Sequence, residues 1–514
     1  MAAVLSLTLL IYASSLDNEF VHDDWITISQ NEHLRELSNL DDFFLDPGLF
    51  HKSGVSSHTR PVLLVTFALN YAFGSEPSGF RAVNLALHLI NIVLSYLLVR
   101  RIFSERLPAR QSRFIGLFAC AVFAVHPLNT QAVIYISSRS VLLSYTFYVA
   151  AVLLYLRWRN RLESSGRVPP GSFSGFLLCI CLALLTKENT VSVAGMLILL
   201  EVALFQSRRR NARRLLMTLV AGFGPVLLLL VYRWAVLASA AASAGPPAVE
   251  IMHYTNVSHG YPWHLATQIK AQLIYLMLFL WPSELAIQHV VAHVTSLTDP
   301  AFAAGSVLVI AATAWAFPRW WRGSLPATLI LWYCCAMGPE ALLRLNMIVN
   351  EHRFYLPGIA LIGFCGWLLL VLRSSVERRM PWTRYAAAAG LCVLVIALGA
   401  RSRDYARQWK TACTLWEYTA RVSSEDSWAN NNAGNCRLLA GNLPGAEEAY
   451  RRALELAPDN YLALYNLGLV CERQGRLREA IAFYERFEAM AGGGQPLPEI
   501  RRTVARLRHQ LDAR

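Results

Sequence analysis

Long apolar segments separated by short polar loops occupy the first 400 or so residues of this chain. The apolar runs are 15–24 residues long, close to the ~20 residues that an α-helix needs to cross the hydrocarbon core of a bilayer. Only 16% of the residues are charged, against about 25% in soluble domains, which also indicates a membrane protein. We predict eleven spanning helices, near residues 1–16, 82–99, 114–130, 140–156, 173–187, 190–205, 215–235, 302–317, 325–339, 354–372 and 385–401.

Basic residues concentrate in some of the loops, and this concentration predicts the topology. Five loops carry most of these residues: 100–113, 157–167, 208–214, 318–323 and 373–384. The positive-inside rule places them in the cytoplasm, so the net charge of +13 reports topology rather than a nucleic-acid partner. If the apolar run at 273–282 spanned, the last two loops and their six arginines would move outside. We therefore expect that run to be re-entrant or interfacial, with the N-terminus inside and the C-terminal part outside.

Residues 1–15 are apolar but lack a basic n-region. We interpret them as a short first span rather than a cleaved signal.

After about Asp404 the composition becomes that of a water-soluble helical domain. Two segments, 428–460 and 462–490, align there with a period of 34 residues, which is typical of tetratricopeptide repeats. The matching pairs are Gly434 with Gly468, Gly441 with Gly475, Ala446 with Ala480, and Tyr450 with Tyr484. We expect these repeats to bind an acceptor protein or peptide in a concave groove, or else to brace the membrane domain.

The predicted fold is therefore all-α: a polytopic helical membrane domain followed by a soluble tetratricopeptide-repeat solenoid. The expected boundaries are 1–403 for the membrane domain with its first outside loop at 17–81, 404–514 for the repeat domain, 427–460 and 461–494 for the two repeats, and 497–512 for a capping helix.

The ten cysteines show neither metal-binding nor disulfide spacing. Seven lie in apolar segments and are expected to pack as small side chains. Cys413, Cys436 and Cys471 lie in the soluble part without a CxxC pattern, so we predict no structural zinc there.

Charged residues gather on the predicted outside face. The first outside loop has ten Asp or Glu against four Lys or Arg, and it includes FVHDDW with the adjacent Asp23 and Asp24. Shorter outside loops carry Arg139, Lys187, Glu351 and Arg353. Each of these could be an ion pair holding helices in register, but ionisable groups at membrane depth usually serve function.

Carboxylates facing cations in this way suit sugar transfer from a lipid-linked phosphate. Arg and Lys can hold the anionic phosphate by charge-assisted hydrogen bonds. A nearby carboxylate can accept the proton of an attacking hydroxyl.

The order of motifs resembles a known family. FVHDDW, TRPV (59–62), FRAVNLALHLIN (80–91), HPLNTQAVIYISSRSVLLS (126–144), LLTKENTVSV (184–193) and NEHRFYLPGIAL (350–361) are followed by the repeats. This order resembles the transmembrane and tetratricopeptide repeat protein O-mannosyltransferases and their bacterial relatives, which are GT-C glycosyltransferases. The resemblance implies a GT-C fold, a dolichyl- or polyprenyl-phosphate sugar donor, and a catalytic acid in the first outside loop.

The resemblance also implies roles for individual residues. Asp23 matches the expected catalytic base and Asp24 its acidic neighbour. The positions expected near the donor phosphate are Arg139, Lys187 and Arg353, with supporting positions Glu188, Glu351, Tyr355, His126 and Arg60. The chain departs from the family pattern at His22, Gln131 and His352, and Gln131 stands where an acid is common.

We expect no required metal or other cofactor, although His22, Asp23, Asp24, His126 and His352 could meet around a divalent ion on the outer face. The alternative for His126 is a helix cap before Pro127. His88 and Asn84 lie one helical turn apart, and we expect an interhelical hydrogen bond from them, with donor binding as the alternative.

The leading hypothesis is an integral membrane glycosyltransferase that moves a sugar, mannose being one candidate, from a polyprenyl phosphate to a hydroxyl of an extracytoplasmic protein. The alternatives are an O-oligosaccharide ligase or polymerase, and a non-enzymatic membrane scaffold. The Ala- and Arg-rich composition favours a bacterial source, and therefore the bacterial inner membrane. In a eukaryote the corresponding membrane would be that of the endoplasmic reticulum.

Overall fold

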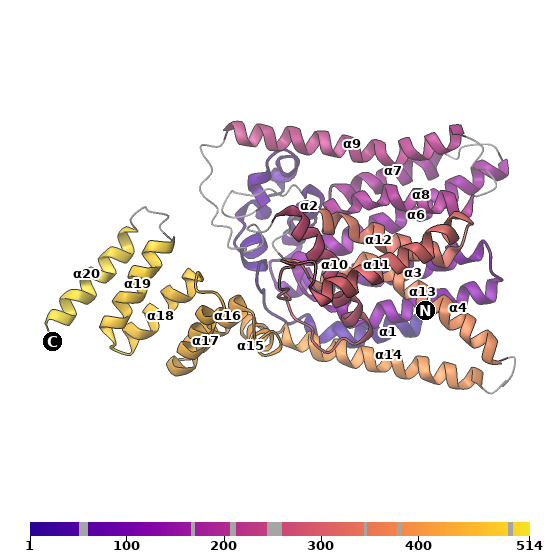
Figure 1. The fold of residues 1–514 in the computed structure, drawn as a ribbon. Coiled ribbons are helices and arrows are strands. Elements are labelled where there is room, and N and C mark those ends of the chain that lie inside the picture. Colours follow the sequence, from indigo (N-terminus) through magenta and orange to yellow (C-terminus); the bar gives the residue numbers. More distant parts are fainter. Residues whose placement is uncertain are drawn as a thin grey trace. The chain divides into compact units, whose positions relative to one another are not determined.

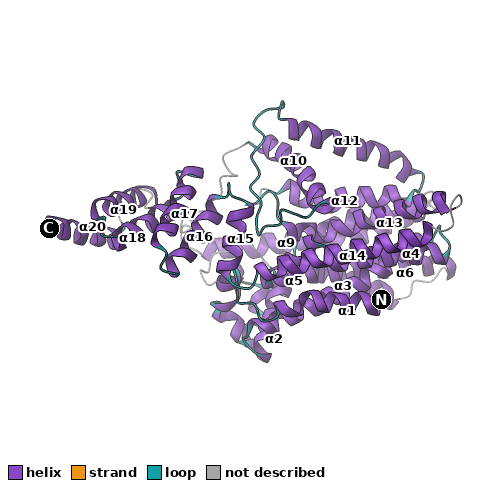
Figure 2. Cartoon of the chain, turned by 90° about the horizontal axis from the view of Figure 1, so that it is seen from below, coloured by secondary structure: helices purple, strands orange, loops and turns teal. Residues whose placement is uncertain are grey.

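The computed structural model describes residues 1–50, 60–165, 170–205, 212–243, 260–343, 347–377, 383–491 and 497–513. Across these residues the chain is helical and contains no β-strand (Figure 2). Contacts divide it into two units, with the change near Trp409. Parts of the predicted basic loops and of the first outside loop, Thr59 of TRPV, and the end of the second repeat lie outside the described residues.

The first unit is a bundle of α-helices (Figure 1). Its helices are α1 (Ala2–Tyr12), α2 (Pro61–Phe73), α3 (Pro77–Ser104), α4 (Ala109–Val125), α5 (Thr130–Ile134), α6 (Arg139–Ser165), α7 (Pro170–Leu184), α8 (Ser192–Leu204), α9 (Ala212–Ser243), α10 (Tyr261–Leu280), α11 (Pro300–Trp321), α12 (Leu325–Leu342), α13 (Tyr355–Glu377) and α14 (Thr383–Gln408). α1 lies beside α14 in both views.

The described helices give fewer membrane-spanning candidates than the sequence predicts. Seven are long and apolar enough to cross a bilayer, or eight if α4 and the bent segment after it form one span. The expected count of eleven is therefore not confirmed. The apolar helices at 2–15, 61–73 and 171–184 are shorter than a bilayer requires, and α8 has only 13 residues. The run at 273–282 belongs to the 20-residue α10, and its predicted re-entrant position stays a prediction.

Polar side chains line the contacts between α3 and its neighbours. Asn84, His88, Asn91 and Ser95 follow one another at helical spacing and are all buried. His88 Nδ1 lies 2.8 Å from the hydroxyl of Tyr355 on α13, which confirms the expected interhelical hydrogen bond. These contacts satisfy polar groups away from water, where unpaired groups are costly.

The segment between α1 and α3 packs into an apolar cluster that also includes residues of α3 and α6. This segment contains a π-helical turn, Trp25–Ser29, several short 3-10 turns, and α2. Phe20, Ile28, Phe67 and Phe80 belong to its buried cluster. This apolar cluster fixes the loop that contains Asp23 and Asp24, so side-chain packing holds the acidic pair in place.

The second unit contains stacked helix pairs: α15 (Ala412–Val422), α16 (Ser427–Leu439), α17 (Leu443–Leu456), α18 (Tyr461–Arg473), α19 (Leu477–Ala491) and α20 (Pro498–Asp512) (Figure 1). α16 packs on α17, and α18 on α19.

The predicted small residues allow these pairs to pack closely. A Cβ added at Gly434 would come within 2.6 Å of the Tyr450 ring, and one at Gly468 within 2.7 Å of the Tyr484 ring. Each crossing therefore requires glycine, and the tetratricopeptide pattern is confirmed.

A disulfide joins Cys413 to Cys436, with a Cα–Cα distance of 5.4 Å. The expectation that the cysteines lack a disulfide arrangement was therefore wrong. The two residues are 23 positions apart in sequence, but α15 folds back on α16 and brings them together.

A candidate active site in the first loop and its cationic neighbours

The two adjacent carboxylates of FVHDDW have different environments. Asp24 is fully buried. Its Oδ1 accepts hydrogen bonds from the backbone N–H of Ser137 at 2.8 Å and from the Ser137 hydroxyl at 2.6 Å. Burial raises the pKa of Asp24 to about 6, although the bonds from Ser137 and the charge of Arg81 oppose this rise. Asp24 therefore fastens the first loop to the turn before α6.

The side chain of Asp23, in contrast, is 57% exposed. His22 precedes it with a φ of +52°, a conformation that is uncommon for residues other than glycine. The imidazole Nδ1 of His22 lies 3.5 Å from Asp23 Oδ1, and the ring stacks on Tyr135. The turn thus directs one carboxylate into the protein and leaves the other accessible to a substrate.

Tyr135 completes the surroundings of the acidic pair. Burial, together with the negative charges of Asp23 and Asp24, holds the pKa of Tyr135 well above its usual range. Its phenol therefore remains protonated beside the two carboxylates. Tyr135 lies within the 126–144 motif, but nothing in the local sequence pattern distinguishes it from its apolar neighbours.

Arg81, at the start of α3, is a second residue that the sequence analysis missed. It is buried and donates hydrogen bonds to the carbonyls of Asn18 and Glu19, just before FVHDDW. A third bond, from Nε, reaches the carbonyl of Ile134 at 3.2 Å. A charge at the start of an apolar span is a signal that could have identified it. Arg81 ties the beginning of the acidic loop to the same α5–α6 region that Asp24 contacts.

Arg139 occupies a different environment from the one expected of a phosphate ligand. Its guanidinium is fully buried and donates to the side chains of Asn84 at 2.9 Å and Asn70 at 2.8 Å. It also donates to the carbonyls of Thr66 and Phe80. These bonds join α2, α3 and α6, so in this structure Arg139 positions the helices, and its phosphate role stays a prediction.

A cationic cluster forms around two glutamates. Glu188 receives Arg60 Nη2 at Oε2 and Arg233 Nη2 at Oε1, both at 3.0 Å. Arg60 directly precedes α2 and Arg233 lies on α9, so the carboxylate bridges two distant segments. Arg60 and Glu188 were expected as supporting residues, whereas Arg233 was hidden in a predicted span and was missed.

The second glutamate is Glu340, near the end of α12. Arg353 Nε lies 3.3 Å from its Oε2, and Lys187 Nζ lies 3.9 Å from its Oε1. Asn189 donates to the same Oε1 at 3.0 Å. Burial lowers the pKa of Lys187 to about 8; Glu340 opposes this effect, whereas the positive charges of Arg60 and Arg353 reinforce it.

The four cations and two carboxylates of this cluster leave two positive charges in excess. We define the cationic cluster as Arg60, Lys187, Arg233 and Arg353 with Glu188 and Glu340.

Contacts through α5 connect the cationic cluster to the acidic loop. The Oε1 of Gln131 on α5 accepts a hydrogen bond from the backbone N–H of His352, next to Arg353, at 2.9 Å. α5 in turn precedes the turn that holds Asp24. The departure at Gln131 is thus a backbone acceptor in the structure.

The remaining predicted residues lie at the edges of this arrangement. Glu351 is fully buried in a short 3-10 turn, Glu351–Phe354. Tyr355 accepts from Asn91 at 3.3 Å in addition to its contact with His88. His126 accepts from the backbone N–H of Leu128 at 3.3 Å and caps the next turn, as expected for its alternative role.

In the described part of the chain, no group of three or more His, Cys, Asp or Glu side chains could hold a metal ion. The oxygens of Asp24 are directed to Ser137 and to the N–H of Val21. Both ring nitrogens of His126 contact backbone groups. The five residues considered as ligands therefore do not converge in the described part of the chain.

Comparison with known proteins finds similarity to a family model of the repeat unit and to protein O-mannosyl-transferases. Residues 398–461 and 440–494 match the family model described as tetratricopeptide repeat. The chain is 25% identical over 524 residues to protein O-mannosyl-transferase TMTC3 of Mus musculus, covering 94% of this chain and 54% of that protein. It is 26% identical to Tmtc3 of Drosophila melanogaster, covering 94% and 58%. These relatives confirm the resemblance predicted from the motifs, and the chain spans about half the length of the relatives it matches.

Two solved structures are also similar. The archaeal oligosaccharyltransferase AglB from Archaeoglobus fulgidus, in complex with an inhibitory peptide and a dolichol-phosphate, is 14% identical, with a TM-score of 0.45 over 83% of this chain and 59% of that one. ArnT from Cupriavidus metallidurans, bound to undecaprenyl phosphate, is 15% identical, with a TM-score of 0.40 over 94% and 79%.

Proposed function

We propose that this protein is an integral membrane glycosyltransferase that transfers a sugar, with mannose as the first candidate, from a polyprenyl-phosphate donor to a hydroxyl of an extracytoplasmic protein. The observation that carries the proposal is the accessible Asp23, held beside a buried Asp24 and connected by contacts to a cationic cluster with two excess positive charges. The similarity to protein O-mannosyl-transferases over 94% of the chain supports it.

In the proposed reaction, the oxygen of the acceptor hydroxyl forms a bond to the anomeric carbon of the sugar. The bond between that carbon and the phosphate oxygen breaks, and its electron pair leaves with the phosphate. Asp23 accepts the hydroxyl proton, because its carboxylate is the exposed member of the acidic pair. Asp24 and Arg81 hold the loop in place and do not exchange protons with the substrate.

The charge of the cationic cluster fits the leaving group better than the donor. A sugar phosphodiester carries one negative charge, whereas the released phosphate monoester carries between one and two near neutral pH. Negative charge therefore grows on the phosphate as the bond breaks. Cations that are already in place stabilise this growth more than they stabilise the bound donor, which is the requirement for catalysis.

The repeat unit is proposed to lie outside the cytoplasm and to hold the acceptor. The Cys413–Cys436 disulfide supports this side of the membrane, because disulfides persist in the periplasm and the endoplasmic-reticulum lumen rather than in the cytosol. Tetratricopeptide units present grooves that bind extended or helical peptide segments. The membrane itself is proposed to be a bacterial inner membrane, or the endoplasmic-reticulum membrane if the source is a eukaryote.

The test is transfer of label from polyprenyl-phosphate [³H]mannose to protein by the purified full chain, with peptides and membrane extracts as acceptors. Parallel reactions use glucose, galactose and aminosugar donors, and one series contains EDTA. The proposal predicts alkali-labile label on Ser or Thr that persists in EDTA. Absence of transfer with every donor would favour the scaffold hypothesis.

A further inference from the structure

A cavity of about 380 Å³ lies at a point where three candidate spans end or begin. Its lining includes no residue of the acidic loop or of the cationic cluster. α3 ends at Ser104, α11 ends at Trp321, and α12 begins at Leu325. The apolar part of the lining includes Phe103 and Trp367, the latter from α13. Because these are ends of membrane-spanning candidates, the cavity lies at the depth of lipid headgroups.

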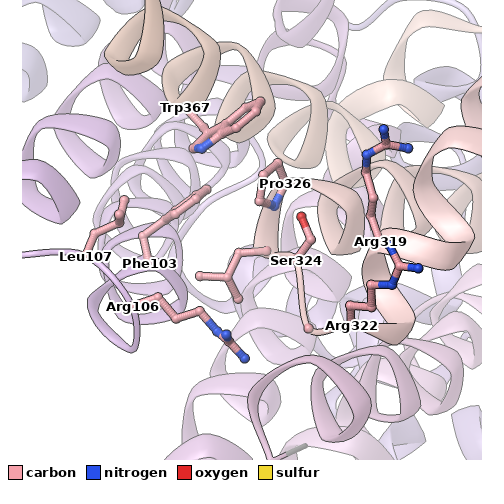
Figure 3. Close-up of a pocket in the computed structure, with 10 residues that line it drawn as sticks. Phe103, Arg106, Leu107, Arg319, Arg322, Ser324, Pro326 and Trp367 are labelled. Atoms are coloured by element: carbon pink, nitrogen blue, oxygen red, sulfur yellow. The ribbon is translucent and has the colours of Figure 1, made fainter. Parts of the chain in front are cut away.

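Three arginines surround this cavity (Figure 3). Arg106 donates through Nη2 to the carbonyl of Ala203 at 2.9 Å. Arg319 donates through Nη1 to the carbonyl of Trp315 at 2.9 Å. Within the described residues, no ion pair joins Arg106, Arg319 or Arg322 to a carboxylate. Each guanidinium has five N–H groups, so most of the donors at this cavity remain available.

The beginning of α12 adds to the positive character of the cavity. Gly323, with a φ of +88°, turns the chain between α11 and α12, and Ser324 occupies the N-cap without a side-chain capping bond. The hydroxyl of Ser324 lies among the lining residues, together with Pro326 (Figure 3). The N-terminus of an 18-residue helix carries partial positive charge and free N–H groups that favour an anion.

We propose that this cavity binds the phosphate-bearing headgroup of an anionic phospholipid. In this proposal the phosphate lies among Arg106, Arg319, Arg322 and the Ser324 hydroxyl. The part of the acyl chains next to the headgroup lies against Phe103 and Trp367. Two features favour an anionic phospholipid as the ligand: the positive charge of the cavity and its position at the ends of membrane-spanning helices. Cations beside apolar side chains at this depth are expected of lipid-headgroup pockets. Both basic loops that form it are predicted to face the cytoplasmic leaflet, where anionic lipids are exposed to them.

This site is independent of the proposed sugar transfer. It uses none of the residues of the acidic loop or the cationic cluster. Its expected role is to fix the relative positions of α3, α11, α12 and α13, because a bound headgroup would bridge the ends of these helices.

The test is native mass spectrometry of the purified full chain titrated with phosphatidylglycerol, with phosphatidylcholine in parallel and inorganic phosphate as competitor. The variant Arg319→Gln/Arg322→Gln removes two of the cations. The matched control, Arg110→Gln/Arg113→Gln, removes two exposed arginines from the same face outside the cavity. A third variant, Leu107→Trp, fills the cavity and keeps every arginine.

We expect the intact protein to retain phosphatidylglycerol in preference to phosphatidylcholine, and the double variant to bind it at least roughly tenfold more weakly, given the contribution of single basic residues near anionic lipid. Leu107→Trp should lose the same lipid, while the control should change affinity less than twofold. Equal weakening in the control would attribute binding to general surface charge and overturn the proposal. Displacement by phosphate at equal concentration would identify a free-anion site instead, and retention of phosphatidylcholine would contradict charge recognition.

Discussion

The buried carboxylate of Asp24 makes a definite contribution to the pH dependence of stability. Burial raises its pKa from 3.8 to about 6, a shift of two units that corresponds to roughly 3 kcal/mol. The folded state therefore binds a proton more tightly than the unfolded state. As a result, the free energy of unfolding falls by about 3 kcal/mol as pH rises through the window from about 4 to about 6.

Asp24→Asn removes this dependence, because asparagine does not titrate. Its side-chain carbonyl can still accept the two bonds from Ser137, while its NH₂ group would face the N–H of Val21, 3.4 Å from Oδ2 in the present structure. That mismatch offsets part of the gain at high pH. The pH slope is consequently a sharper readout than the absolute stability.

The assay is thermal unfolding in detergent, followed by tryptophan fluorescence at several pH values from 4 to 8. The intact protein should lose thermal stability between pH 4 and pH 6 by a component that Asp24→Asn lacks. Asp41→Asn, at an exposed acid of the same loop, is the control and should keep the full slope. If Asp24→Asn shows the same pH slope of thermal stability as the intact protein, the buried carboxylate of Asp24 does not have a raised pKa in the folded state, and the reasoning is refuted.

Three further predictions concern the cationic cluster and the repeat unit. Transfer activity should fall as pH rises through about 8, where Lys187 loses its charge, and Lys187→Arg should move this fall to higher pH; an unchanged profile would exclude the amine. Arg233→Gln should raise the donor KM or lower kcat by roughly tenfold, as expected for one charge-assisted contact to phosphate, and wild-type kinetics would remove this residue from the site. Reduction of the Cys413–Cys436 disulfide, which closes a 23-residue separation, should destabilise the repeat unit by about 3 kcal/mol; thiol labelling that finds both cysteines free before reduction would contradict the pairing.

Local patterns were sufficient to predict much of the fold. The period of 34 residues predicted the helix pairs of the second unit. The repeated glycines are part of this pattern because Gly434 and Gly468 lie against tyrosine rings where the helices cross. The apolar runs likewise predicted long helices such as α3 and α13. They did not predict how long each helix is: α1, α7 and α8 are shorter than a span usually requires, so the count of eleven spans is not confirmed.

The contacts that form the candidate site join residues distant in sequence, so local sequence patterns could not predict them. The sequence marked Arg139 and Lys187 as equivalent cations on one face, but Arg139 is engaged by asparagine side chains, whereas Lys187 faces Glu340. Arg233 was overlooked because it belongs to an apolar helix.

The disulfide was missed for a similar reason. Neither Cys413 nor Cys436 has a neighbouring cysteine, so only the folding of α15 against α16 brings them together. A charge inside a predicted span, and a cysteine on each of two consecutive amphipathic helices, are the signals that would have pointed to these features.

The central claim is that Asp23 accepts the proton of the acceptor hydroxyl during sugar transfer. The most direct measurement compares the initial rate of label transfer from polyprenyl-phosphate [³H]mannose for the intact protein, Asp23→Asn and the control Asp41→Asn, in membranes with matched expression. Loss of the base should lower the rate by about 10²–10⁴-fold, while Asp41→Asn keeps it and all three proteins unfold at similar temperatures. Transfer by Asp23→Asn at the intact rate would contradict the account.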